Sequence, residues 1–275
     1  MERAPSQCIL CNSTRRTLLF QQGQWTVYKC AECGLGVLDP RPDPDELDEL
    51  YRREYFSSHY DKGVAVGSPE MKRRISQEDH RIKFFRLLKK SGRILDIGCG
   101  MGYFLHACRP FGYQVEGMDV SGDSASYVRE ELGIPVTTGM IDEVEFDEGS
   151  FDIITMWHAL EHVPDPRVHV AKAWRWLKPD GLFVVDVPNH EGTDAVNMWD
   201  TWTGWSLPYH LYHFTPATLT ALLSLSGFEP VRAKYYHSEY IKEKLKRIPL
   251  VGLVARPIAK LYSGNSVAVA ARKKD

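Results

Sequence analysis

The sequence lacks a strong charge of either sign. Its 275 residues carry 34 lysines and arginines against 36 aspartates and glutamates, so the formal net charge is -2. A protein that binds nucleic acid through its phosphates needs an excess of basic residues, so the overall charge gives no support to a nucleic-acid partner. Charged residues make up 25% of the chain and hydrophobic residues 43%, as is typical of a soluble globular protein.

Long apolar runs are also missing. No stretch reaches the length that spans a bilayer, and residues 1–5 do not have the pattern of a secretory signal peptide. Six cysteines in a chain of this size do not suggest a disulfide scaffold. We therefore expect a cytoplasmic protein in a reducing compartment, with one large domain and a small appendage.

The most informative stretch lies between a predicted buried strand, residues 93–97, and a helix that opens at 103–108. It contains Gly98, Gly100 and Gly102 in a G-x-G-x-G pattern that begins two residues after Asp96. Glycine is needed there because the turn is tight and a ligand must approach the backbone closely. Asp119 closes the next predicted strand, where a carboxylate can accept hydrogen bonds from both ribose hydroxyls of a nucleoside cofactor. This order is half of a doubly wound nucleotide-binding fold.

The acid before the loop indicates which nucleotide binds. A carboxylate at this place would repel a pyrophosphate and favour a cofactor that carries an ammonium group. S-adenosylmethionine (SAM) has an ammonium group, a ribose diol and no phosphate. With this loop and Asp119, the chain resembles the class I SAM-dependent methyltransferases.

The resemblance covers residues 93–273. It implies an α/β, Rossmann-like, doubly wound sheet of seven strands, in which the last strand (266–271) lies antiparallel between the fifth (182–187) and the sixth (228–235). Shorter strands are expected at 134–136 and 151–156, helices at 121–132 and 168–177, and a turn at 178–181. The residues expected to bind the cofactor are Asp96, Gly98, Cys99, Gly100, Gly102, Tyr103, Asp119, Val120, Ile141, Asp142, Trp157 and His158.

One position departs from the family pattern. The family usually has an acid directly after the glycine that corresponds to Gly139, and Met140 stands there instead. The contact with the adenine amino group is therefore expected from Asp142 or from the backbone of Ile141.

Four cysteines form two C-x-x-C pairs, Cys8 with Cys11 and Cys30 with Cys33, eighteen residues apart. This spacing is typical of a zinc site in which four thiolates surround the ion, and a predicted strand at 25–28 completes a zinc ribbon. Redox-active thiols or an iron–sulfur site are the alternatives. Because four thiolates leave no open position for a substrate, we expect a structural zinc ion.

The chain is expected to divide into three parts: the ribbon at 1–44, a helical linker or lid at 45–90, and a methyltransferase domain at 91–275 with an aromatic insertion at 190–216. A rigid, proline-rich connector ends the ribbon, and Asp45 is expected to cap a helix that carries Leu47 and Leu50. The linker ends in a helix at 71–90. Its aromatic residues either pack on the main domain or close over the cofactor; they are Tyr51, Tyr55, Phe56 and Tyr60.

Residues 157–163 follow the strand at 151–156. Ligands in open α/β sheets bind outside the carboxyl ends of strands, so His158, Glu161 and His162 are expected near the methyl donor, in a functional or a structural role. The insertion is unusually rich in aromatic residues. Its run at 208–216 is similar to one in a bacterial methyltransferase subfamily, many of whose members carry the same ribbon and some of which methylate deoxysugars or act in polysaccharide pathways.

Methyl transfer requires an acceptor held at about 3 Å from the methyl carbon and deprotonated. Histidine has a suitable pKa near neutrality. We predict that His210 or His213 is the base, that His158 or Glu161 assists, and that Tyr209 belongs to the same cluster. The alternative is that these residues only cover the end of the sheet.

The acceptor expected from the resemblance is a nucleotide- or lipid-linked sugar, methylated on oxygen or carbon. A quinone or another small aromatic acceptor is the first alternative, because the Glu161-His162 pair also occurs in such O-methyltransferases, and a metal beyond the ribbon zinc would favour it. The second is a ribbon that targets the enzyme to RNA or protein, against which the few basic residues of the ribbon loop argue. A scaffold without activity is least consistent with the intact loop. The sequence does not indicate an oligomeric state.

Residues 240–262 combine basic and apolar residues, with Pro249 and Pro257 interrupting any single helix. The segment is expected to be a connecting helix or a contact with a membrane that holds a lipid-linked acceptor.

Overall fold

The computed structural model describes residues 3–43, 46 and 64–274. The larger sheet is formed by β4 (Gly92–Ile97), β5 (Tyr113–Asp119), β6 (Val136–Thr138), β7 (Phe151–Trp157), β8 (Leu177–Pro188), β10 (Phe228–His237) and β11 (Ser263–Lys273). Their order is β10-β11-β8-β7-β4-β5-β6, and β11 runs antiparallel to both of its neighbours. The Rossmann-like methyltransferase arrangement expected from the sequence, with the last strand antiparallel, is confirmed.

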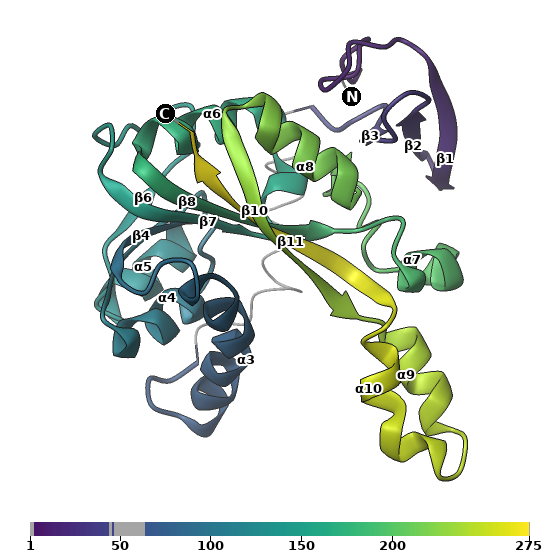
Figure 1. Cartoon of the computed structure of the whole chain (residues 1–275). Helices are drawn as coiled ribbons and strands as arrows, with labels where there is room; N and C mark the ends of the chain where they lie inside the picture. Colours follow the sequence, from purple (N-terminus) through teal and green to yellow (C-terminus); the bar gives the residue numbers. More distant parts are fainter. Residues whose placement is uncertain (1–2, 44–45, 47–63, 275) are drawn as a thin grey trace.

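Helices cover both faces of this sheet (Figure 1). On one face lie α3 (Pro69–Arg86), α4 (Tyr103–Cys108) and α5 (Gly122–Glu130), and on the other lie α6 (Pro166–Trp176) and α8 (Pro216–Leu225). Successive strand residues point to opposite faces, so Ile94 packs into the first core and Leu95 into the second. Because both faces are covered, the central strands are apolar almost throughout.

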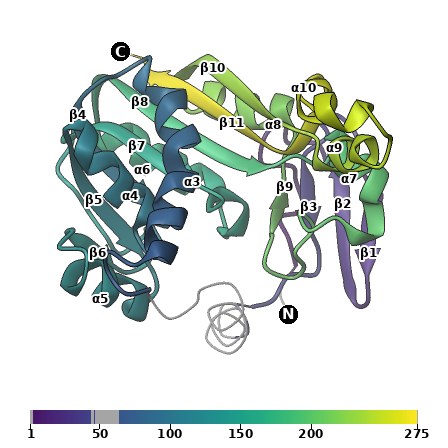
Figure 2. The same ribbon diagram turned by 90° about the horizontal axis from the view of Figure 1, so that it is seen from below.

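A smaller sheet combines three N-terminal strands with one strand of the aromatic insertion. It consists of β1 (Arg16–Gln22), β2 (Trp25–Cys30), β3 (Gly36–Leu38) and β9 (Tyr212–His213), in that order. The strand β9 belongs to the aromatic insertion and pairs antiparallel with β3, so that Gly36 lies opposite His213. The N-terminal hairpin is therefore attached to the insertion by backbone hydrogen bonds, as the neighbouring purple and green strands in Figure 2 show.

The remaining elements lie in the insertion, in the C-terminal excursion and in short connections. They are α7 (Thr193–Met198), α9 (Glu239–Lys246) and α10 (Ala255–Ala259), with the short 3-10 turns η2 (Arg109–Phe111), η3 (Leu160–His162), η4 (Trp199–Thr201) and η5 (Val251–Val254). In the part of the chain that is described, no helix is both long and apolar enough to cross a membrane.

Two expected elements are placed differently. The third strand begins at Val136 instead of Ile134, because Pro135 has no N–H for the ladder and contributes only its carbonyl, which accepts from the Gly117 N–H at 2.9 Å. The expected turn at 178–181 lies inside β8, where the pairing with β7 shifts between Phe151 and Ile153. Asp180 takes a left-handed φ of 57° there, so the chain bulges and continues as strand.

Helix bounds differ by a few residues. The helix expected at 71–90 begins at Pro69, after Ser68 caps it, and ends at Arg86. The expected helix cap at Asp45, with Leu47 and Leu50, and the linker aromatics Tyr51, Tyr55, Phe56 and Tyr60 lie outside the described residues. The division of the chain at 44/45 and 90/91 stays a prediction.

Candidate active site

The glycine loop at the carboxyl end of β4 adopts a backbone that favours glycine. Gly98, Gly100 and Gly102 have φ angles of 77°, 50° and 68°, in the left-handed region. A Cβ added at Gly98 would lie 2.9 Å from the Cβ of Ala159, and one at Gly102 would lie 2.9 Å from Val128 Cγ2. The loop is therefore the tight glycine turn that the sequence predicts, and Ala159 and Val128 also approach its backbone closely.

Asp119 ties this loop to the end of β5. Its Oδ2 accepts from the Gly100 N–H at 2.7 Å, and its Oδ1 accepts from the Ser121 N–H at 2.9 Å. Burial raises the pKa of Asp119, and the N–H groups of Ser121 and Gly100 oppose that rise only in part. Each carboxylate oxygen retains a second lone pair, so the side chain is able to accept two ribose hydroxyls.

Asp96 lies beneath the loop on β4. It is 3% exposed, and its Oδ1 accepts from the Thr155 hydroxyl at 2.6 Å. Burial raises the pKa of Asp96 to about 7, against the lowering effects of Thr155 and Arg81. A cationic ligand beside it would favour the ionised carboxylate, and the ammonium group of SAM fits that requirement.

The other residues predicted to bind the cofactor surround the same edge of the sheet. Val120 follows Asp119 directly and is 55% exposed. Asp142 is exposed, whereas the Ile141 carbonyl accepts from Lys172 Nζ at 2.7 Å. That carbonyl retains a second lone pair, so both Asp142 and the Ile141 backbone stay candidates for the adenine amino group.

Three further predicted residues are at least partly buried. Cys99 is buried and packs closely on Gly117. A Cβ added at Gly117 would lie 2.6 Å from Cys99 Sγ, so position 99 requires a small side chain. Tyr103 packs edge-on against Tyr127, and Trp157 is 7% exposed at the end of β7. All three line or support the loop.

His158 follows Trp157 and has a strained backbone, with a φ of 54°. Such a conformation costs a residue with a Cβ about 1–2 kcal/mol and is often found at functional sites. The side chain is 43% exposed, and its Nδ1 lies 3.3 Å from Glu161 Oε1, while its Nε2 lies 3.9 Å from Asp186 Oδ2. Both carboxylates are fully buried, so the exposed imidazole is held between two buried acids.

These two acids change the chemistry of the imidazole. Burial lowers the pKa of His158, but Asp186 and Glu161 raise it by more, so the net direction is upward. Asp186 is itself held by the Tyr236 hydroxyl, which donates to its Oδ2 at 2.5 Å. Tyr236 on β10 thus holds the Asp186 carboxylate on β8, which lies 3.9 Å from the exposed ring.

Asp186 and Tyr236 were not among the site residues predicted from the sequence. A signal for Asp186 was present, because it is the only acid in an otherwise apolar buried strand at 182–187, and a buried acid needs a partner. Tyr236 carries no comparable signal, since its contact with Asp186 depends on strand pairing across β11.

A second cluster lies behind His158. Donor atoms of Glu161, His162 and His210 all lie within 4.8 Å of one another. His162 Nδ1 contacts the Tyr209 carbonyl at 3.1 Å and His210 Nδ1 contacts the Gly204 carbonyl at 2.9 Å, which leaves each Nε2 as the acceptor. Glu161 Oε2 is buried and has no hydrogen-bond partner among the described residues. Two histidines and a carboxylate in this arrangement are a donor set for a metal ion.

His213 lies farther from the edge. It is 3% exposed on β9, with its ring centroid 5.3 Å from that of Trp205 and 6.2 Å from that of His210. Burial moves its pKa well below the ordinary value. The structure thus brings His158, Glu161 and His210 together, places half-buried Tyr209 beside them through the His162 contact, and sets His213 behind them.

The four cysteines of the two C-x-x-C pairs converge at the N-terminal end. Their Sγ atoms lie within 4.8 Å of one another, with 3.4 Å between Cys8 and Cys33 and 3.5 Å between Cys11 and Cys30. Burial raises the pKa of Cys30, yet the N–H groups of Cys33 and Glu32 bring it down to about 7. A thiolate is therefore readily formed within the cluster.

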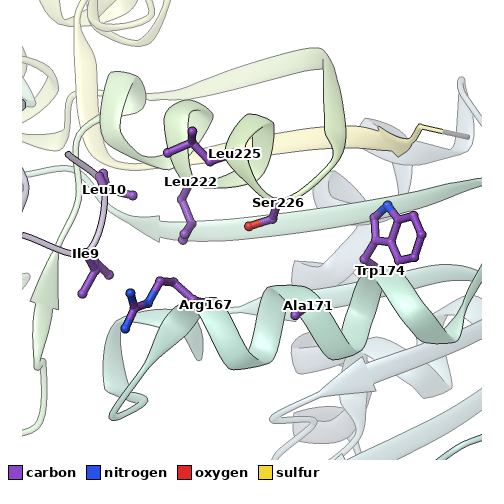
Figure 3. A pocket seen from close by; sticks show the side chains of 8 residues that line it. All are labelled: Ile9, Leu10, Arg167, Ala171, Trp174, Leu222, Leu225 and Ser226. Carbon is purple, nitrogen blue, oxygen red and sulfur yellow. The ribbon is translucent and has the colours of Figure 1, made fainter. Parts of the chain in front are cut away.

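A groove of about 360 Å³ lies elsewhere, between the first cysteine pair and helices α6 and α8 (Figure 3). Apolar side chains such as Ile9, Leu10 and Leu222 line it, and Arg167 is its only charged lining residue. It contains none of the loop or histidine residues, so we place the reaction at the carboxyl edge of the sheet.

Comparison with known proteins agrees with this fold. Residues 70–233 match the family model described as a methyltransferase domain, and the chain belongs to this family. A probable SAM-dependent methyltransferase of Mycolicibacterium smegmatis is 28% identical over 157 residues, which are 54% of this chain and 58% of that protein.

Other relatives and solved structures are more distant or match shorter segments. The ubiquinone biosynthesis O-methyltransferase of Thiobacillus denitrificans is 35% identical over 95 residues, 32% of this chain and 41% of that protein. The chain thus spans only about half the length of these curated relatives. The 1,6-didemethyltoxoflavin-N1-methyltransferase of Burkholderia thailandensis, solved with S-adenosylhomocysteine, has a TM-score of 0.55 at 20% identity and covers 94% of this chain and 99% of its own. A SAM-dependent methyltransferase of Archaeoglobus fulgidus has a TM-score of 0.56 at 21% identity, and the match covers 74% of this chain and 94% of that one.

Proposed function

We propose that the protein methylates a small polar acceptor, a nucleotide- or lipid-linked sugar, with His158 as the group that takes the acceptor proton. The observation that carries the proposal is the exposed imidazole held between two buried acids beside the glycine loop. The sequence prediction gave the base to His210 or His213, but these side chains are 8% and 3% exposed. We assign them to positioning: His210 lies beside Glu161, and His213 lies beside His210.

SAM, when bound, supplies a methyl group activated by its sulfonium charge. The acceptor oxygen or carbon forms a bond to the methyl carbon as the sulfur–carbon bond breaks, and the acceptor proton moves to His158. Glu161 and Asp186 stabilise the imidazolium that results, because both are buried carboxylates next to the ring. Neutral His158 is the active form, so turnover is expected to rise with pH through its raised pKa.

His158→Gln tests this role. The variant retains a polar side chain but accepts no proton near neutrality, so we expect turnover to fall by about 10²–10⁴-fold. SAM affinity, measured by calorimetry, is expected to stay within about twofold because the cofactor loop is unchanged. Acceptors are screened as nucleotide sugars, with S-adenosylhomocysteine release as the readout. Equal loss of SAM binding and turnover would contradict a proton-transfer role.

We also propose that Cys8, Cys11, Cys30 and Cys33 hold a structural zinc ion. Four sulfurs at about 2.3 Å from a tetrahedral ion lie about 3.8 Å apart, which the observed spacing accommodates with small adjustments. Their thiolates would fill every coordination position, so the ion would fix the ribbon and take no part in methyl transfer.

A small aromatic acceptor is the second candidate, and one observation favours it. Glu161, His162 and His210 form a donor set that the sugar hypothesis does not require, and relatives named ubiquinone biosynthesis O-methyltransferase share part of the sequence. Metal analysis separates the two acceptor classes. One bound metal ion per chain supports the sugar acceptor. A second bound ion supports the aromatic acceptor if His210→Ala removes both that ion and the activity on catechols.

A further inference from the structure

The C-terminal excursion carries leucines that the fold does not bury. We call residues 239–262 the tip; it comprises α9, η5 and α10 and projects beyond the ends of β10 and β11 (Figure 1). Leu250, Leu253 and Leu261 are 86%, 86% and 83% exposed. Three neighbours are about half exposed: Ile248, Val254 and Tyr262. A patch of this kind marks a contact with a partner or a membrane.

Leu250 has a second unusual property. Its φ is 69°, in the left-handed region where glycine or asparagine is usual. Leu250 therefore has an unfavourable backbone conformation, and its side chain, which is 86% exposed, makes few contacts that would offset the cost. Neither property contributes to the stability of the isolated fold.

The tip is also basic, in contrast to the chain as a whole. It contains six lysines and arginines against two glutamates, whereas the whole chain has a net charge of -2. Glu239 pairs with Lys242, and Glu243 pairs with Lys246. Within the described part of the chain, Arg247, Arg256 and Lys260 form no ion pair, so the positive charge remains available to an anionic surface.

The base of the tip is firmly attached. Asp194 on α7 is fully buried, accepts from the Ser238 hydroxyl, and accepts from the N–H groups of Glu239 and Tyr240 at 3.1 and 3.2 Å. These bonds cap α9 and join it to the aromatic insertion. Because β10 runs parallel to β8, its end at His237 lies on the same edge as the cofactor loop.

We propose that the tip binds the surface of an anionic lipid bilayer, with its leucines in the acyl boundary and its basic residues on the headgroups. An amphipathic segment of apolar and basic residues is the usual form of such a contact. A second copy of the chain fits less well, because a two-fold contact through this surface would bring two basic tips together. A bound bilayer would lie beside the carboxyl edge, which suits a lipid-linked acceptor; only this last consequence rests on the proposed function.

Vesicle flotation tests the proposal without SAM or acceptor, so its outcome is independent of the methyltransferase assignment. The full chain is mixed with vesicles of phosphatidylcholine alone or of equal parts phosphatidylcholine and phosphatidylglycerol. We expect binding to the anionic vesicles, weakened by high salt, and at least about tenfold weaker partitioning of Leu250→Asn/Leu253→Ser/Leu261→Ser. Asparagine suits the φ of residue 250, so this variant is expected to fold, and circular dichroism checks that it does.

Leu87→Ser is the matched control, since Leu87 is 70% exposed at the end of α3 and far from the tip in sequence. It is expected to bind vesicles as the unchanged chain does. The proposal would be overturned if the unchanged chain did not bind anionic vesicles, or if the triple variant bound them equally well. It would also be overturned if the unchanged chain and Leu87→Ser were dimers and the triple variant a monomer, because the leucines would then form a protein–protein contact.

Discussion

The pairing of β3 with β9 predicts that loss of the zinc ion proposed for the four cysteines stops turnover and spares SAM binding. The Leu38 N–H donates to the Leu211 carbonyl at 3.0 Å, directly beside His210, and His190 Nε2 contacts the Gly34 carbonyl at 3.3 Å next to the second cysteine pair. Phe20 stacks on Trp205 with ring centroids 4.3 Å apart. The insertion is therefore ordered in part by the ribbon, whereas the glycine loop is not.

The size of the effect follows from what the ribbon buries. Phe20, Leu38 and Trp205 are each at most 5% exposed. Burying a large apolar side chain contributes about 1.5–3 kcal/mol, so these contacts together hold the insertion by roughly 5 kcal/mol. Loss of that amount would leave the ordered insertion in the minority, and we expect turnover to fall by at least about 100-fold.

The perturbation is Cys33→Ser, with Cys108→Ala as the control, because Cys108 is a buried cysteine of the α4 core outside the ribbon. Metal content, S-adenosylhomocysteine release and SAM calorimetry are measured on both. The expected result for Cys33→Ser is lost metal, lost turnover and a SAM Kd within about threefold. Unchanged turnover without metal would refute the reasoning, as would an equal loss of SAM binding.

Three further predictions concern the site. Asp96 has a pKa of about 7 in the folded chain against 3.8 ordinarily; its folded form thus holds the proton more tightly, and stability falls as pH rises from about 4 to about 7, by up to ~4 kcal/mol. Asp96→Asn is expected to flatten the Tm-against-pH curve of the cofactor-free protein, and an unaltered curve would contradict this. Gly98→Ala is expected to cost about 1–3 kcal/mol in urea unfolding, because its Cβ would meet Ala159 at 2.9 Å; a neutral effect would contradict the close approach. Tyr236→Phe leaves buried Asp186 without its hydroxyl donor. We therefore expect the free energy of unfolding in urea to fall by about 1–3 kcal/mol, and an unchanged value would contradict the role of Tyr236 in holding Asp186.

Local sequence patterns predicted the parts of the fold that depend on local physics. Buried apolar runs located β4, β5, β7 and β8, and the glycine spacing located the left-handed loop. Where the chain departs from such patterns, the prediction was wrong: Pro135 delays β6, and the residues before Gly181 continue as strand instead of turning.

Long-range contacts could not be predicted from the same patterns. Nothing local to Tyr212 and His213 indicates that they form a strand with β3, because the partner is more than 170 residues away. The contact of Tyr236 with Asp186 likewise depends on the sheet order. The sequence placed His210 and His213 in the site, but their burial, which favours His158 as the base, appears only once the ribbon and insertion are packed.

Calorimetric titration of SAM into the unchanged chain and into Asp119→Ala tests the central claim most directly. The account predicts micromolar binding to the unchanged chain and a loss of at least about tenfold in the variant, because Asp119 orders the loop through Gly100 and would accept the ribose hydroxyls. Asp123→Ala, an acid in the first turn of α5, serves as the control and is expected to bind as the unchanged chain does. Equal SAM binding by Asp119→Ala, or none by the unchanged chain, would contradict the assignment of this edge as the cofactor site.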